Sequence, residues 1–240
     1  MYTQKTEKMN KGGRKAFAER AVENAAAYKS PKPPKLPERP EREPLAAAAG
    51  RAGEDEDVRG RLFSGEELEN TALSGADFYG CTFSECRFSG VSLEEVHFSD
   101  CLFQGCDLSN LRMEGGGFHR AEFRNCRLLG ASFSGTLFDD ALFLHCGASY
   151  GNFAECRFRG CLLQGSDFSE GSFGGSRFQK SSLEECRFRR TEFFHAEIKG
   201  LDFSSSSLEG AAFSIADVNG ITVSAEQAVE LSKLLGIRVK

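Results

Sequence analysis

The stretch CTFSECRFSG at residues 81–90 places two cysteines five residues apart, each followed two positions later by a phenylalanine. The spacing continues: every fifth residue from Leu73 to Val223 gives 31 positions, of which 19 are Phe and seven are Leu. The residue two before each is small at 26 of these positions. All nine cysteines of the chain occupy this small position, where they alternate with Ala, Ser, Thr and Gly. We therefore interpret them as small core residues rather than redox thiols.

A period of five fits neither an amphipathic helix nor a continuous strand. It predicts a chain that turns a corner every five residues and buries one large and one small side chain in each segment. Stacked coils of such segments form a solenoid, in which each coil contacts only its neighbours. The period alone does not decide between coils of three sides and coils of four.

The triplets ADF (76–78), CRF (86–88), CDL (106–108), AEF (121–123), SDF (166–168) and LDF (201–203) resemble the repeat of the pentapeptide-repeat family. The resemblance covers about residues 63–223. It implies an all-β fold, a right-handed quadrilateral parallel β-helix of about eight coils with ladders of Phe and Leu inside. At about 4.8 Å per coil, the rod would be roughly 37 Å long. One turn of B-DNA is similar, about 34–36 Å.

Three regions follow: an N-terminal extension (1–60), the β-helix (61–223), and a C-terminal helix and tail (224–240). A helix is predicted near Phe17–Tyr28. All six prolines of the chain lie between residues 31 and 44 and predict a stiff linker within a largely disordered extension. A partner-binding or nucleic-acid-binding arm is the alternative for this extension.

The C-terminal region carries the signals of a short amphipathic helix. Ser224 with Gln227 three residues later is a capping box, and Gly236 is a stop signal. The apolar stripe could cap the open end of the solenoid or pair with a second copy. The helix is similar to the dimerising tail of the quinolone-resistance (Qnr-like) branch of the family, which implies a homodimer. The predicted dimer residues are Val229, Leu231, Leu234 and Leu235.

Catalysis, metals and cofactors are not expected. Cysteines 86, 106, 126 and 146 are 20 residues apart, so on a square coil they form a column and do not converge on one zinc ion. The four histidines fall at outward positions without a nucleophile and acid beside them. No apolar stretch is long enough to span a bilayer and no signal peptide is evident, so we expect no membrane contact and a reducing cytoplasm.

Function is therefore expected on the outer surface, which is most acidic between residues 63 and 143, with 13 acidic and 5 basic side chains. The candidate acidic partner-binding surface is Asp77, Glu94, Glu95, Asp100, Asp139 and Asp140. Outward leucines of one side predict an apolar patch: Leu102, Leu142, Leu144 and Leu162.

Qnr-like proteins and their mycobacterial relatives are understood as DNA mimics. The resemblance implies a type II topoisomerase (DNA gyrase or topoisomerase IV) as partner, modulated or protected from quinolone-type poisons. Direct nucleic-acid binding by the β-helix is not expected. The unbroken register lacks the loops that interrupt Qnr coils, as in the mycobacterial relatives. A non-catalytic structural or adaptor solenoid for another protein is the alternative.

Overall fold

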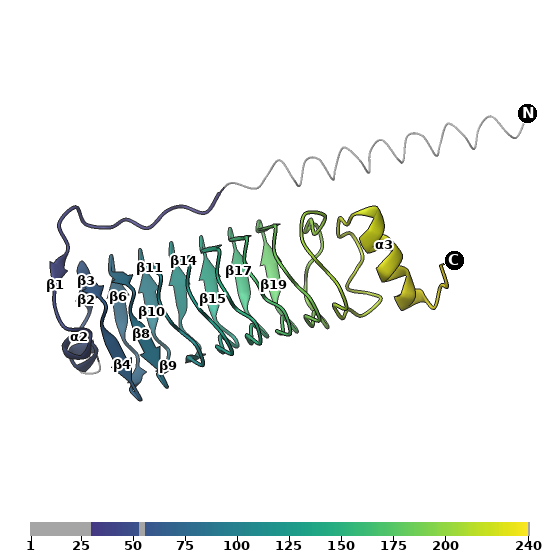
Figure 1. The fold of residues 1–240 in the computed structure, drawn as a ribbon. Coiled ribbons are helices and arrows are strands. Elements are labelled where there is room, and N and C mark those ends of the chain that lie inside the picture. The colour runs from purple at the N-terminus through teal and green to yellow at the C-terminus, as the bar shows by residue number, and fades with distance from the viewer. Residues whose placement is uncertain (1–29, 53–55, 240) are drawn as a thin grey trace, which may run out of the picture.

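The computed structural model describes residues 30–52 and 56–239, and its main body is a parallel β-solenoid with four faces (Figure 1). Every strand pairing joins residues that are 20 apart, for example Phe83 with Phe103 and Phe103 with Phe123. Four segments of five residues therefore make one coil. This register settles the question that the period left open, because a three-sided coil would pair residues 15 apart.

The four faces follow one another along each coil. The first face holds β1 (Glu41–Arg42), β3 (Arg61–Ser64), β7 (Thr82–Ser84), β11 (Leu102–Gln104), β14 (Glu122–Arg124), β16 (Leu142–Leu144), β18 (Leu162–Gln164) and β20 (Ser182–Glu184). The second holds β4 (Glu67–Glu69) and β8 (Arg87–Ser89), and the third holds β5 (Ala72–Ser74), β9 (Ser92–Glu94) and β12 (Arg112–Glu114).

The fourth face holds β2 (Val58–Arg59), β6 (Asp77–Tyr79), β10 (His97–Ser99), β13 (Gly117–His119), β15 (Leu137–Asp139), β17 (Arg157–Arg159) and β19 (Arg177–Gln179). About seven turns thus carry regular strands. Isolated bridges continue the same register on the other faces and reach Asp202 paired with Thr222.

The corners explain why glycine is so common in this chain. Residues whose numbers end in 0 or 5 form the corners, and there the backbone takes a positive φ, as at Gly75 (65°) and Lys180 (50°). Sixteen non-glycine residues also adopt this conformation, all of them at corner positions. The left-handed region costs an L-residue about 1–2 kcal/mol relative to the right-handed one. Such a cost at sixteen positions implies that burial inside the coil is strong enough to impose the turns.

The core consists of phenylalanine ladders that run along the rod. On the first face the rings of Phe83 and Phe103 stack with centroids 4.6 Å apart, and those of Phe103 and Phe123 are 4.9 Å apart. Rings of adjacent faces meet edge to face, as do Phe118 and Phe123 at 5.0 Å and 71°. Each buried ring contributes about 1.5–3 kcal/mol through burial. The ladders therefore account for most of the cohesion of a narrow rod.

The small inward position does more than fill space. The Cys106 thiol donates a hydrogen bond to the carbonyl oxygen of Phe83 at 3.2 Å, 23 residues earlier. Ser166 occupies the same position three coils later and donates to Phe143 at 3.3 Å. All nine cysteines are free and buried. Burial raises the pKa of Cys156 and Cys161 to about 12, which keeps both as unreactive thiols.

The helix that follows the proline-rich residues was not predicted from the sequence. The helix α2 (Leu45–Ala52) lies at the N-terminal end of the solenoid (Figure 1) and buries one stripe against it. Leu45, Ala48, Ala49 and Ala52 are at most 2% exposed. Their spacing of three, four and seven residues places them on one side of a helix. This helix excludes water from the first coil. The helix predicted near Phe17–Tyr28 lies outside the described residues.

At the other end, the helix α3 (Ala225–Ser232) and the short helix η1 (Lys233–Leu235) follow the last coil. The predicted capping box is present, because the Gln227 N–H donates to the Ser224 hydroxyl at 3.2 Å and the Ser224 N–H donates to the Gln227 side chain at 2.8 Å. Gly236 ends η1 with a φ of 71°, as predicted. The Gln227 amide also donates to the carbonyl oxygen of Phe203 at 2.9 Å, which attaches the helix to the solenoid.

Candidate interaction surfaces

Opposite charges on the outer surface are paired between neighbouring coils. Among the described residues, ten of the seventeen ion pairs join residues 20 apart, which lie directly above one another. Arg187 with Asp167 and Arg190 with Glu170 are examples. An exposed ion pair contributes about 0–1 kcal/mol. The ladder of pairs therefore matters less for stability than for the electrostatic character of the surface, which it neutralises locally.

Four of the six predicted acidic surface residues belong to ion pairs, three of them between neighbouring coils and one with the N-terminal segment. Asp77 faces His97, and Asp100 accepts two hydrogen bonds of 2.6 Å from Arg120. Asp139 pairs with Arg159 at 2.6 Å, and Asp140 pairs with Lys32 at 3.1 Å. The Arg159 hydrogen bond lowers the pKa of Asp139. Asp100, Asp139 and Asp140 thus each have an arginine or lysine partner and Asp77 has a histidine partner, so these four carboxylates do not form one continuous negative surface.

The other two, Glu94 and Glu95, form a separate group with Glu114. In strand register Glu114 lies directly above Glu94 on the third face. All three side chains are exposed, and none pairs with a cation within residues 30–52 and 56–239. Like charges opposite one another destabilise a sheet. Among the described residues, these three carboxylates thus form one acidic group without a cation partner at the third face. Glu114 was missed in the sequence because its stacking on Glu94 appears only at a spacing of 20.

The predicted leucine patch is more buried than expected. Leu142 is only 8% exposed, and Leu102, Leu144 and Leu162 are half-buried. Leu162 and Glu122 flank Leu142 in strand register and cover it from both sides. The four leucines do share the first face as predicted. Their exposed area is smaller than a row of free leucines would present.

The C-terminal end exposes more apolar surface than the leucine patch does. Leu231 and Leu234 are partly buried against the last coil, whereas Val229 and Leu235 are 44% and 62% exposed. Three further apolar side chains of this end are more than half exposed: Ile215, Ile237 and Val239. The predicted dimer stripe is therefore divided, with one half on the solenoid and the other half facing outward.

A hollow of about 210 Å³ lies on the fourth face where Gly117 has no side chain. His97, His119, Leu137 and Asp139 line it. The His119 Nδ1 lies 2.9 Å from an Asp139 oxygen, and Arg120 contacts the other ring nitrogen. A guanidinium thus occupies the place that a nucleophile would need beside a catalytic histidine. The arrangement is suited to contact with a partner's side chain.

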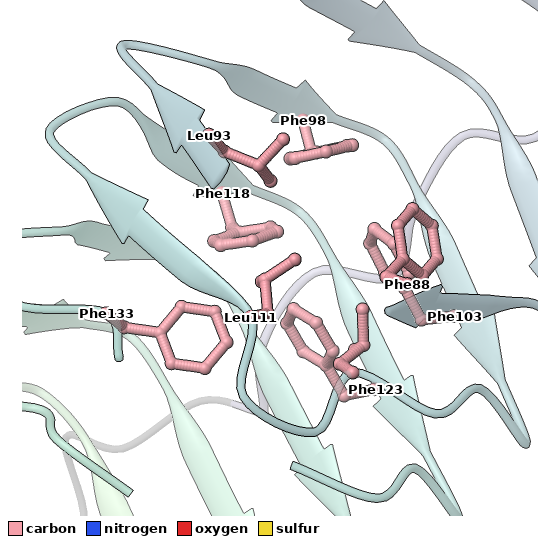
Figure 2. Close-up of a pocket in the computed structure, with 9 residues that line it drawn as sticks. Phe88, Leu93, Phe98, Phe103, Leu111, Phe118, Phe123 and Phe133 are labelled. Carbon is pink, nitrogen blue, oxygen red and sulfur yellow. The ribbon is translucent and has the colours of Figure 1, made fainter. Parts of the chain in front are cut away.

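The interior contains a second, much smaller space between the ladders (Figure 2). Its volume is about 10 Å³, and only apolar side chains line it, including Leu93, Phe98, Leu111 and Phe118. It forms where the third face carries Leu93 and Met113, before the phenylalanine ladder of that face begins at Phe133. A space of about 10–15 Å³ is the least that holds one water molecule, and an apolar wall gives that water no partner. We regard it as a packing gap rather than a ligand site.

Among the residues that the structure describes, no three His, Cys, Asp or Glu side chains lie together in a way that could hold a metal ion. None of the described helices is long and apolar enough to cross a bilayer.

Family models agree with this fold. A model described as a pentapeptide repeat region matches residues 76–153, 116–188 and 136–213, and one described as pentapeptide repeats matches residues 59–90. Together they span more than half of the chain. The chain belongs to the pentapeptide-repeat family. A search of curated proteins found no match.

Several solved structures are similar in fold. HetL, a pentapeptide-repeat protein involved in heterocyst differentiation regulation in the cyanobacterium Nostoc, is 18% identical with a TM-score of 0.40, covering 69% of this chain and 84% of that one. Full-length QnrB1, a plasmid-mediated fluoroquinolone resistance protein, is 18% identical with a TM-score of 0.31, covering 76% and 99%. A protein of the Arabidopsis thaliana thylakoid lumen is 20% identical with a TM-score of 0.14, covering 74% and 75%.

Proposed function

We propose that this solenoid is a non-catalytic protein-binding module whose partner presents a basic surface to the third face. The supporting observation is the group formed by Glu94, Glu95 and Glu114. Elsewhere in this half of the rod, many of the carboxylates are neutralised by the next coil. Uncompensated charge on a rigid surface accelerates and orients the docking of an oppositely charged partner.

We further propose a type II topoisomerase as that partner and the homodimer as the binding form. The basic DNA-binding groove of such an enzyme complements the glutamate group, and the rod has roughly the length of one turn of B-DNA. The resemblance to the Qnr-like branch supports the same partner. The exposed apolar side chains around Val229 and Leu235 support pairing of two C-terminal ends. The nine free thiols fit the reducing cytoplasm in which this enzyme works.

The test is a gyrase supercoiling assay with the purified full chain, alone and with a quinolone. We expect wild-type protein to change the supercoiling rate or the drug sensitivity, and the variant E94Q/E95Q/E114Q to lose most of this effect. The matched control is D167N, which removes a carboxylate that already pairs with Arg187. No effect of wild-type protein up to micromolar concentration would exclude the topoisomerase.

The second candidate function is that of an adaptor that holds another protein. The hollow on the fourth face supports it, because binding of a topoisomerase through the glutamate group would not involve this hollow. Leu137 is 41% exposed beside it and could receive an apolar side chain. Cross-linking in a native lysate with wild-type protein and with L137K, which replaces the exposed apolar side chain beside the hollow by a charged one, distinguishes the two functions. A topoisomerase subunit captured equally by both proteins favours the first function, and a different protein lost with L137K favours the second.

A further inference from the structure

Residues 31–40 follow the outer edge of the solenoid with prolines at a spacing of three. A polyproline II helix has three residues per turn, so residues at this spacing share one side. Three of these prolines are half-buried, whereas the residues between them are exposed. The proline side therefore faces the solenoid and the other two sides face solvent. The prolines concerned are Pro31, Pro34, Pro37 and Pro40.

The rise of this segment matches the rise of the coils. The Lys32 side chain contacts Asp140 at 3.1 Å, and the Lys35 N–H donates to Asp100 at 2.8 Å. Asp100 and Asp140 are corner residues two coils apart, a distance of about 9.6 Å at the usual strand spacing. Three residues of polyproline II advance about 9.3 Å. One turn of the segment therefore spans two coils, and its contacts repeat in register with the edge.

Charge sets the direction of the segment along the edge. Its basic half, Lys32 and Lys35, lies over the corner carboxylates. Directly after the segment, Glu41 and Glu43 pair with Arg61 of the first coil. Asp100 has a second partner in Arg120, but Lys32 is the one cation that pairs with Asp140 in the described part of the chain. The charge of Asp140 is therefore exposed to any partner whenever this segment is released.

The segment is bound to the solenoid but is not part of its core. None of residues 30–44 is buried, in contrast to α2, which follows directly. The ion pair of Lys32 is weak, because its side chain is 75% exposed. A preorganised polyproline helix loses little entropy on binding, and its attachment to the chain gives it a high effective concentration. Residues 31–40 therefore resemble a peptide ligand that binds weakly to the solenoid and stays bound because it belongs to the same chain.

We propose that the corner edge formed by Asp100 and Asp140 is a recognition site for lysine-bearing polyproline II segments of other proteins, and that residues 31–40 occupy this site in cis. The partner in trans is a proline-rich segment with a lysine that pairs with Asp140 and, three residues later, a non-proline residue whose backbone N–H binds Asp100. The cis segment lowers the apparent affinity for this partner by the fraction of time that the edge is free. The site is separate from the glutamate group of the third face, so it does not depend on the function proposed above.

The experiment uses a fluorescent peptide of residues 30–41 and the full-length chain. Fluorescence anisotropy measures its affinity for wild-type protein and for K32E/P34G, which removes the Asp140 contact and one proline of the buried side. We expect this variant to bind the peptide at least about tenfold more tightly, because its edge is free for a larger fraction of the time. Adding D100N and D140N to it should abolish binding, whereas adding E94Q and E95Q should not.

Trypsin reports independently whether the segment has opened. Within residues 31–40 the bond after Lys35 is the susceptible one, because Lys32 and Arg39 precede prolines. Mass spectrometry should find faster cleavage after Lys35 in K32E/P34G than in wild type. Equal cleavage rates would show that these contacts do not hold the segment and would overturn the proposal. Faster cleavage without tighter peptide binding, or binding that survives D100N/D140N, would overturn it as well.

Discussion

The two ends of the solenoid are covered by helices of equal length, eight residues each, that are buried to very different extents. The N-terminal helix α2 has four side chains that are at most 2% exposed, and α3 has none that is buried. Ion pairs of Glu43 with Arg51 and Arg61 fasten the N-terminal end further. That end is complete within one chain. The C-terminal end retains exposed apolar side chains, which the proposed homodimer would bury.

The largest loss in the free energy of unfolding is expected for a substitution in the interior of the rod, and the two ends can be compared with it. Phe123→Ala removes a ring that is 1% exposed and stacks between Phe103 and Phe143. We expect a loss of about 3–5 kcal/mol in the free energy of unfolding, measured by urea denaturation. A loss below 1 kcal/mol would mean that the ladders do not carry the stability of the fold.

The matched pair Leu45→Ala and Leu231→Ala compares the ends directly. Leu45 is 1% exposed in α2, whereas Leu231, a residue of α3, is only partly buried against the core. We expect Leu45→Ala to cost about 2–4 kcal/mol and Leu231→Ala about 1 kcal/mol in the same urea experiment, since the cost follows the burial that is lost. Equal costs would contradict the difference between the ends.

The pH dependence of the N-terminal end depends on Glu43. The hydrogen bond from Arg51 lowers the pKa of Glu43, against the opposing effect of burial, and Arg61 lowers it further. The carboxylate therefore stabilises the fold above its unfolded pKa, and this stabilisation is lost as the pH falls through the lower folded pKa. Thermal unfolding between pH 7 and pH 3 should show a smaller loss of Tm in E43Q than in wild type. The C-terminal control E226Q should follow wild type.

The smallest effect on stability is expected at the exposed half of the C-terminal stripe. The variant V229K/L235K changes side chains that are 44% and 62% exposed, so unfolding should shift by no more than about 0.5 kcal/mol. Sedimentation velocity should nevertheless show a dimer for wild type and a monomer for the variant. A variant that remains dimeric would place the dimer contact elsewhere.

The inward columns could be predicted from the sequence, because the period of five never slips between Leu73 and Val223. The spacing of 20 between charge partners could also be predicted from a four-sided coil, but which of these pairs form depends on side-chain geometry that the sequence does not contain. The helix α2 was missed because an alanine-rich run after Pro44 carries no strong cap or charge pattern, although Leu45, Ala48, Ala49 and Ala52 have helical spacing. The fit of residues 31–40 to the edge depends on the match between the advance of three polyproline II residues and the spacing of two coils. A local sequence pattern contains neither length.

The pairing of charges between coils also makes the order of the coils specific. Removing residues 101–120 would leave every corner and every inward side chain in phase, so the backbone could still close. Asp140 would then lie directly above Asp100. Arg120, which pairs with Asp100 in the native chain, would be missing. Such a shortened rod should fold with a local repulsion where the native chain has an attraction. The charge pairs on the surface therefore favour one order of the coils, whereas the repeated inward side chains do not distinguish one coil from another.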